Sequence, residues 1–176
     1  KGEMPELAVK CIESWKKFCP DYEIMVWNEE NFDINCNRYV KEAYEAKKFA
    51  FVSDVARLTA LYNFGGIYLD TDVMVLKSFD EYLHHIGFFG FESKKAVQTG
   101  VIAFEKESEI VGELLKDYDK RSFITENNTF DLTTNVAVIT KAFQEKGLVL
   151  NGEYQEVCGI AFYPPNIFAK VWHSAS

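Results

Sequence analysis

The sequence predicts a single α/β domain, a sandwich in which a mixed, mostly parallel sheet is flanked by helices. Helical and strand-like apolar patterns interleave along the chain, which is typical of this class. No repeat, low-complexity tract or proline- and glycine-rich linker divides the 176 residues. Apolar residues make up 48% of the chain, which excludes a disordered protein and supplies a core. We therefore expect one domain over residues 1–176.

The first part of the chain is expected to form three helices and one strand. Leu7, Cys11 and Trp15 recur at helical spacing, and Pro20 follows where the first helix should end. The third helix is followed by two glycines, at the place where a left-handed cap is needed. The predicted elements are helices at residues 6–18, 38–47 and 51–64 and a strand at residues 23–27.

The second part is expected to contain three strands and two helices. Strands are predicted at residues 67–69, 88–91 and 100–104, and helices at residues 109–118 and 136–146. The run Thr133-Thr134-Asn135 precedes the last helix with good capping chemistry, and this role is favoured over acceptor binding.

The charge balance and the apolar pattern exclude two classes of protein. The formal net charge is −8 and acidic residues are spread along the chain, so no nucleic-acid partner is expected. No stretch reaches the roughly 18 uncharged apolar residues of a membrane span. Residues 1–10 lack the apolar segment of a signal peptide. We expect no transmembrane segment. The expected location is the bacterial cytoplasm, or the Golgi lumen in a eukaryote, and peripheral membrane association stays open.

The four cysteines do not form a metal-binding pattern. Cys11, Cys19, Cys36 and Cys158 occur without a CxxC pair or a close cluster with histidine, which argues against structural zinc. Reduced thiols are the favoured interpretation, and a disulfide stays open for an oxidising compartment.

Two carboxylates follow the strand expected at residues 67–69. Alternation along a strand places Tyr68 and Asp70 on one face, and Asp72 joins them if the chain stays extended. In open α/β sheets, ligands bind outside the carboxyl ends of strands. Carboxylate oxygens suit Mn²⁺ or Mg²⁺, which keep positions for phosphate oxygens and water. The pattern predicts a metal site, with a solvated turn as the structural alternative.

Asp54 and Arg57 lie three residues apart on the helix that precedes this strand, and therefore on one face of it. The structural interpretation is an exposed ion pair, worth roughly 0.3 to 0.5 kcal/mol. Spacing alone does not decide between that interpretation and a functional role.

Two sequence blocks together resemble the signature of a sugar-transferase family. They are S-D-x-x-R at residues 53–57 and G-G-I-Y-L-D-T-D at residues 65–72. The pattern is similar to the DXD-containing transferases that include the fungal initiating α-1,6-mannosyltransferase, bacterial capsular-polysaccharide transferases and, more distantly, the large glucosylating toxins. The likeness extends upstream through Pro5, Trp15 and residues 20–28, and fades after about residue 80.

The resemblance implies a GT-A fold and retaining transfer of a sugar from a UDP- or GDP-sugar to a saccharide or another hydroxyl acceptor. Asp72 resembles the direct metal ligand, and Asp70 the residue that contacts the ribose, or the metal through water. Asp54 and Arg57 resemble the pair that grips the donor sugar and the departing phosphates, and Tyr68 packs beside the nucleotide. A divalent cation and a guanidinium would stabilise the charge on the leaving diphosphate. The expected context is bacterial capsular-polysaccharide biosynthesis.

The chain departs from the family pattern at both ends. Family members open with a short strand that forms the nucleobase pocket, whereas here the first helix is expected close to Lys1. They also carry a late element that closes over the metal, and here the similar run is Trp172-His173-Ser174, which makes His173 a candidate metal ligand. We therefore expect a catalytic domain without the family's first strand. Whether the closing segment is also missing stays open at this point.

A haloacid-dehalogenase-type phosphohydrolase is the alternative from another class. Residues 67–73 also fit an apolar strand ending in D-x-D, with Asp70 as nucleophile and Asp72 as general acid. That chemistry needs a later acidic pair for Mg²⁺, yet Asp131 is the last aspartate of the chain. An inactive sugar-nucleotide-binding module is the second alternative, which the presence of both motif aspartates disfavours.

Overall fold

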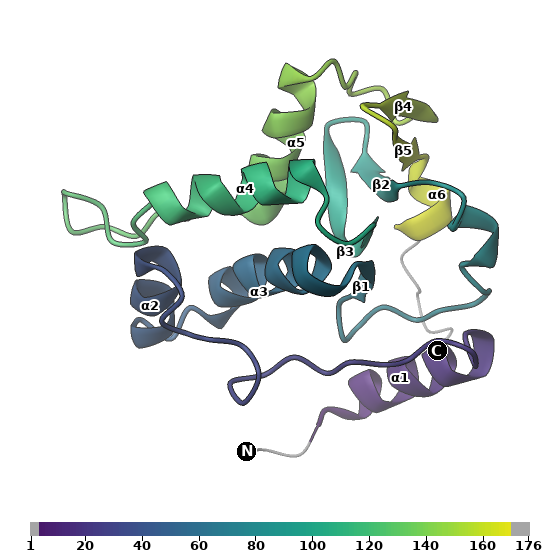
Figure 1. Ribbon diagram of the computed structural model, residues 1–176, viewed down its shortest axis with the longest axis horizontal. Coiled ribbons are helices and arrows are strands. Elements are labelled where there is room, and N and C mark those ends of the chain that lie inside the picture. Colours follow the sequence, from purple (N-terminus) through teal and green to yellow (C-terminus); the bar gives the residue numbers. More distant parts are fainter. Residues whose placement is uncertain (1–3, 170–176) are drawn as a thin grey trace, which may run out of the picture.

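A computed structural model of the protein describes residues 4–169 and contains a five-stranded sheet in the order β1-β3-β2-β5-β4 (Figure 1). Its strands are β1 (Gly66–Leu69), β2 (Gly87–Ser93), β3 (Ala96–Phe104), β4 (Gln155–Val157) and β5 (Ile160–Tyr163). Its helices are α1 (Glu6–Phe18), α2 (Arg38–Glu45), α3 (Phe49–Phe64), α4 (Glu109–Lys120), α5 (Asn135–Glu145) and α6 (Pro165–Phe168), with a 3₁₀ turn at Asp80–Tyr82. None of these helices has both the length and the apolar run that crossing a membrane requires.

The α/β class is confirmed, but the expectation of a mostly parallel sheet is wrong. β1 and β2 both pair antiparallel with β3, and β4 pairs antiparallel with β5. The turn at Lys94-Lys95 joins β2 directly to β3, and so short a connection joins only antiparallel strands. The parallel pair is β2 with β5, which is reached only after α4 and α5.

Most local predictions match the observed elements, and one does not. The helix predicted at residues 6–18 is α1, residue for residue. Residues 23–27 are not a strand, because they form no ladder with another described strand. The hairpin of β4 and β5 and the helix α6 were not predicted. Both hairpin strands are short, and Cys158 and Gly159 turn between them with φ angles of 53° and 77°.

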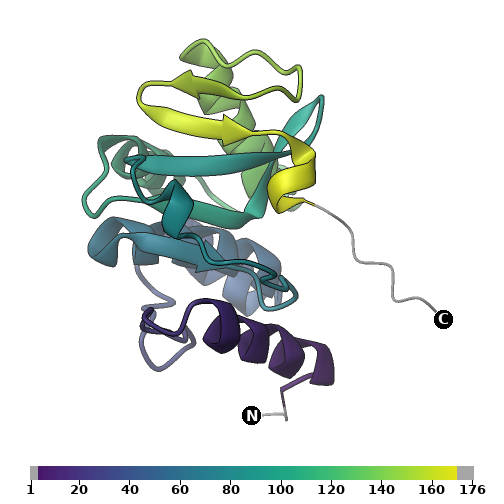
Figure 2. The same ribbon diagram turned by 90° about the vertical axis from the view of Figure 1, so that its right-hand side faces the viewer.

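Two hydrophobic clusters cover the two faces of the sheet. Neighbouring residues of β3 divide between them, since Ile102 packs in the larger cluster and Val101 in the smaller one. The larger cluster joins the sheet to α2, α3, α4 and α5. The smaller cluster includes Phe79 and Phe88, with Trp15 of α1 packed against it. Helix α1 itself lies beyond the β1 edge of the sheet (Figure 2).

The turn between α3 and β1 needs glycine. Gly65 ends α3 with φ 68°, and Gly66 opens β1 with φ 91°, as the left-handed cap predicted from the sequence requires. A Cβ atom on Gly65 would lie only 2.6 Å from the backbone nitrogen of Lys106. The tight turn folds β1 back along α3, which brings Arg57 of the helix to Tyr68 of the strand.

Candidate functional site

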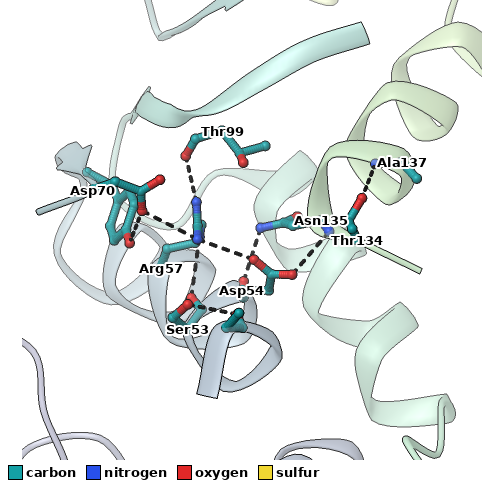
Figure 3. A network of polar contacts seen from close by, with 10 residues as sticks. Ser53, Asp54, Arg57, Asp70, Thr99, Thr134, Asn135 and Ala137 are labelled. Carbon is teal, nitrogen blue, oxygen red and sulfur yellow. Dashed lines mark hydrogen bonds and ion pairs between the residues drawn. The ribbon is translucent and has the colours of Figure 1, made fainter. Parts of the chain in front are cut away.

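Arg57 is the centre of a buried polar network at the carboxyl end of β1 (Figure 3). Its Nη1 donates to the carbonyl oxygen of Thr99 at 2.7 Å. Its Nη2 lies 3.2 Å from Oδ1 of Asp54 and 3.5 Å from Oδ1 of Asp70. One guanidinium therefore connects α3, β3 and the first residue after β1.

Tyr68 and Asp70 share the strand face predicted from alternation. The Tyr68 hydroxyl donates to Oδ1 of Asp70 at 2.7 Å, and its ring lies 4.7 Å from Cζ of Arg57. Burial, with a smaller contribution from the Asp70 carboxylate, raises the pKa of Tyr68, so its hydroxyl stays protonated and donates. The Tyr68 hydroxyl and the Arg57 guanidinium both contact Oδ1 of Asp70, and the Tyr68 ring packs against that guanidinium.

Asp72 does not continue the strand. The Val73 N–H donates to the carbonyl oxygen of Asp70 at 3.0 Å, so residues 70–73 form a turn and the extended geometry considered for Asp72 does not persist. Asp72 is exposed on this turn. Both motif carboxylates still leave the sheet at the same end of β1.

Helix α1 anchors the turn that carries Asp72, a role that sequence reasoning did not assign. Trp15 Nε1 donates to the carbonyl oxygen of Val73 at 2.7 Å, and the Ser14 hydroxyl accepts from the Val75 N–H at 2.9 Å. These bonds span 58 and 61 residues of sequence, so helical spacing alone gave no signal for them.

Asp54 and Arg57 are buried, so the interpretation as an exposed ion pair is wrong. Their exposed fractions are 9% and 6%. Burial raises the pKa of Asp54, while Arg57 and the backbone N–H of Asn135 act in the opposite direction. The Asn135 N–H lies 3.1 Å from Oδ2 of Asp54. Asn135 is another residue of this network that the sequence did not single out for the site.

Three further sequence predictions concern the Thr134 cap, His173 and the cysteines. The Thr134 side chain accepts from the Ala137 N–H at 3.3 Å as the N-cap of α5, which confirms the predicted capping role. His173 lies outside the described residues. All four cysteines are free, with Cys11 and Cys19 buried and Cys36 and Cys158 exposed.

The donor set suits a cation that is completed by phosphate and water. The described residues contain no group of three or more His, Cys, Asp or Glu side chains arranged to hold a metal. Asp70 is partly exposed, with Oδ1 held by Tyr68 and Arg57, and Asp72 is fully on the surface. Mg²⁺ and similar ions are often held by one or two carboxylates together with substrate phosphates. Asp70 and Asp72 fit that arrangement.

A groove of about 340 Å³ runs beside the network. Arg57, Tyr68 and Thr71 are among its polar lining residues, and Arg57 also contacts Asp70. Aromatic side chains from α1, the segment after it and α3 line the rest, among them Trp15, Tyr22, Trp27 and Phe64. A largely apolar groove with a few polar groups is a common form of ligand site.

Residues 5–89 match the family described as "Glycosyltransferase sugar-binding region containing DXD motif", a range that includes Asp54, Arg57, Asp70 and Asp72. Over these residues the chain is similar to the sugar-binding region of DXD-motif glycosyltransferases. The match leaves the haloacid-dehalogenase alternative without support, because it assigns the same aspartates to a different family.

Two curated relatives bear glycosyltransferase names. The chain is 26% identical to inositol phosphoceramide mannosyltransferase 3 of Schizosaccharomyces pombe over 130 residues, which is 69% of this chain and 35% of that protein. It is 27% identical to mouse lactosylceramide 4-alpha-galactosyltransferase over 132 residues, which is 74% of this chain and 35% of that protein. The chain thus aligns with about a third of the length of each relative.

A solved structure supports the fold assignment. PaToxG Glycosyltransferase superposes with a TM-score of 0.59 at 20% identity, over 82% of this chain and 64% of that chain. At this identity the likeness concerns the fold. It places the sheet and the helices described above among glycosyltransferase folds of the GT-A type.

Proposed function

We propose that this domain transfers a hexose from a UDP- or GDP-sugar to a hydroxyl group of a saccharide or another acceptor, with a divalent cation and with retention at the sugar carbon. The observation that carries the proposal is the buried bridge from Asp54 through Arg57 to Asp70, beside the groove and inside the family region. A buried guanidinium that contacts two carboxylates is costly to maintain without a function.

The side chains suggest a division of work around the donor. Asp70 and Asp72 would hold Mn²⁺ or Mg²⁺, which when bound supplies positive charge to the diphosphate oxygens. Arg57 holds Asp70 in place and adds a second positive charge near the leaving group. Asp54 balances and orients Arg57 from the other side. Tyr68 presents a ring beside the nucleotide and a hydroxyl to Asp70.

The domain boundaries expected from the sequence stay part of this proposal. β1 pairs with β3 on one side, and within the described residues no strand pairs with its other edge. The groove is lined both by residues 66–69 of that strand and by residues 22–27. A further short strand, as the resemblance implies, would fit between them and shape the pocket for the nucleobase.

The acceptor and the pathway complete the proposal. Bacterial capsular-polysaccharide assembly in the cytoplasm, with peripheral membrane association, is the context that we propose. The names of the two relatives refer to ceramide lipids, an inositol phosphoceramide and a lactosylceramide, so lipid-linked acceptors belong in the same screen.

Metal-dependent stabilisation by a nucleotide diphosphate tests the proposal. UDP or GDP with Mn²⁺ should raise the melting temperature of the full-length protein far more than nucleotide or Mn²⁺ alone. At one hundred times the dissociation constant, the gain approaches about 2.7 kcal/mol. Asp72→Asn should abolish the Mn²⁺-dependent part and leave the fold intact, because Asp72 is an exposed turn residue.

Glu126→Gln is the matched control, since it removes one exposed carboxylate from a loop far along the chain. It should respond to nucleotide and Mn²⁺ as the wild type does. Equal shifts with and without Mn²⁺, or an Asp72→Asn variant that keeps the full metal effect, would contradict a metal-bridged diphosphate.

A further inference from the structure

Asn135 is a buried polar residue next to the site that the proposed chemistry does not use. It is the first residue of α5 and is only 1% exposed. It meets Asp54, which lies 81 residues earlier on α3. Helices α3 and α5 therefore exchange polar contacts directly at the level of the Asp54–Arg57 pair (Figure 3).

Asn135 holds Asp54 by two separate groups. Its backbone N–H donates to Oδ2 of Asp54 at 3.1 Å, and its Nδ2 donates to the Asp54 backbone oxygen at 3.2 Å. The first contact leaves Oδ1 as the oxygen that faces Arg57 at 3.2 Å. Because both carboxylate oxygens have a defined partner, the Asp54 side chain has one preferred orientation.

The electrostatic setting favours this arrangement. The donating N–H belongs to the first turn of α5, where the helix dipole favours a negative charge. The charged and titratable groups that influence Asp54 include Arg57, Asp70 and Arg121, and the hydroxyls of Tyr39, Tyr68 and Tyr118. Arg57 and Arg121 favour the carboxylate, and Asp70 opposes it.

One atom of Asn135 argues against a purely structural role. Oδ1 is buried and accepts no hydrogen bond within the described part of the chain. A buried polar atom without a partner costs stability, so a smaller or apolar residue at this position would remove that cost. The amide that carries Oδ1 also carries the Nδ2 bond to Asp54.

We propose that Asn135 is a positioning residue that acts through Asp54. By fixing the backbone and carboxylate of Asp54, it keeps Arg57 turned toward Asp70, and α5 becomes part of the support of the donor site. This inference rests on the proposed glycosyl transfer, because its consequence is seen in the chemistry at Asp70 and the diphosphate.

Asn135→Ala tests the inference, with Thr134→Ala as the matched control. Asn135→Ala keeps the backbone N–H but loses the Nδ2 bond, and should lower kcat roughly 10-fold with little change in the acceptor KM, the factor set by one hydrogen bond. Thr134→Ala removes the cap bond at the same helix end without touching Asp54. It should lower the melting temperature and leave kcat unchanged.

A double variant separates positioning from general loosening. If Asn135 acts through the Asp54–Arg57 link, adding Asn135→Ala to Arg57→Lys should lower kcat by clearly less than another 10-fold. If the two substitutions acted independently, their fold reductions in kcat would multiply. Asn135→Ser leaves a smaller void and replaces the Ala variant if that one does not fold.

Two results overturn the inference, and they are distinguishable. If the wild type is active and Asn135→Ala and Thr134→Ala lower kcat equally at matched stability, the positioning role alone is overturned. A wild type without sugar transfer and without Mn²⁺-dependent nucleotide binding overturns the proposed function, and the positioning role with it.

Discussion

Arg57 makes contacts that its three-residue spacing from Asp54 does not predict. Its Nη1 contacts a backbone oxygen of β3, and its Nη2 lies between the carboxylates of Asp54 and Asp70. A planar fork can serve these directions at once, whereas an ammonium is a single point of charge. The residue therefore has a structural and an electrostatic role that substitutions can separate.

Arg57→Ala should destabilise the protein and also reduce turnover. Removing one partner of a buried ion pair costs about 3 to 5 kcal/mol, because the Asp54 carboxylate is left without its counter-charge. Loss of the charge beside Asp70 should lower turnover roughly 10²-fold or more. Arg57→Lys should recover stability in part and turnover only weakly. Unfolding in urea and kcat, measured on the same preparations, check both effects.

Lys106→Ala is a suitable control, since it removes an exposed positive charge outside the network. Its stability and turnover should stay close to wild type. Wild-type turnover in Arg57→Ala, measured where the variant is folded, would remove Arg57 from the donor site and confine the site to the aspartates.

At the scale of elements, the DXD turn depends on a helix that lies far away in sequence. Trp15 and Ser14 of α1 bind the backbone at Val73 and Val75, just after Asp72. The turn is otherwise exposed at Thr71 and Asp72. We infer that α1 limits the conformations that the turn carrying Asp72 can adopt.

Trp15→Phe should weaken metal-dependent nucleotide binding more than it weakens the fold. The ring still packs against the smaller cluster, but the bond to the Val73 oxygen is lost, which is worth about 1 kcal/mol or roughly 5-fold in affinity. Titration calorimetry with UDP or GDP and Mn²⁺ measures the change. Phe18→Leu, on the same helix and against the same cluster, is the control. Equal affinities for the wild type and Trp15→Phe would remove the anchoring role.

The elements also show what the sequence could and could not predict. Periodicity predicted α1, α3, β1 and α4 because each depends on spacing within one segment. It could not predict strand partners, so the antiparallel pairing and the unpaired residues 23–27 were missed. The short β4–β5 hairpin was overlooked, although Gly159 and the apolar run after it were usable signals.

The site likewise contains residues that the sequence indicated and residues that it did not. Asp54, Arg57, Tyr68 and Asp70 lie within 17 residues of each other, and the two blocks that contain them indicated this candidate site from sequence. Trp15 and Asn135 reach it across 58 and 81 residues, and the patterns that contain them, the upstream family likeness and the predicted helix cap, do not indicate these contacts. The burial of the Asp54–Arg57 pair depends on how α5 packs, which i,i+3 spacing does not determine.

At the scale of the whole molecule, this acidic protein pairs its least exposed arginines with carboxylates. The net charge is −8, and Arg57 and Arg121 both act electrostatically on Asp54. Arg121, just after α4, donates from Nε and Nη2 to Oδ2 of Asp131 at 3.1 and 2.6 Å. Its guanidinium also lies 4.9 Å from the ring of Tyr39 and 4.7 Å from that of Tyr118.

The Arg121–Asp131 pair should make stability depend on pH in the acid range. Burial raises the pKa of Asp131, but the bonds from Arg121 and Thr133 outweigh it and leave the pKa below the ordinary aspartate value of 3.8. Between the folded pKa and 3.8, the unfolded chain binds more protons, so stability falls as pH falls. The contribution of the pair is complete above pH 3.8 and disappears as the pH falls through the folded pKa.

Asp131→Asn should therefore lose stability near neutral pH and converge with the wild type in acid. The neutral amide keeps the shape but not the charge-assisted bonds, which are worth about 1.5 to 3 kcal/mol. Urea unfolding of both proteins from pH 7 down to about 3 follows the difference between them. Glu126→Gln, on the exposed part of the same loop, should track the wild type throughout. A difference between Asp131→Asn and the wild type that stays constant with pH would mean that Asp131 acts by shape alone.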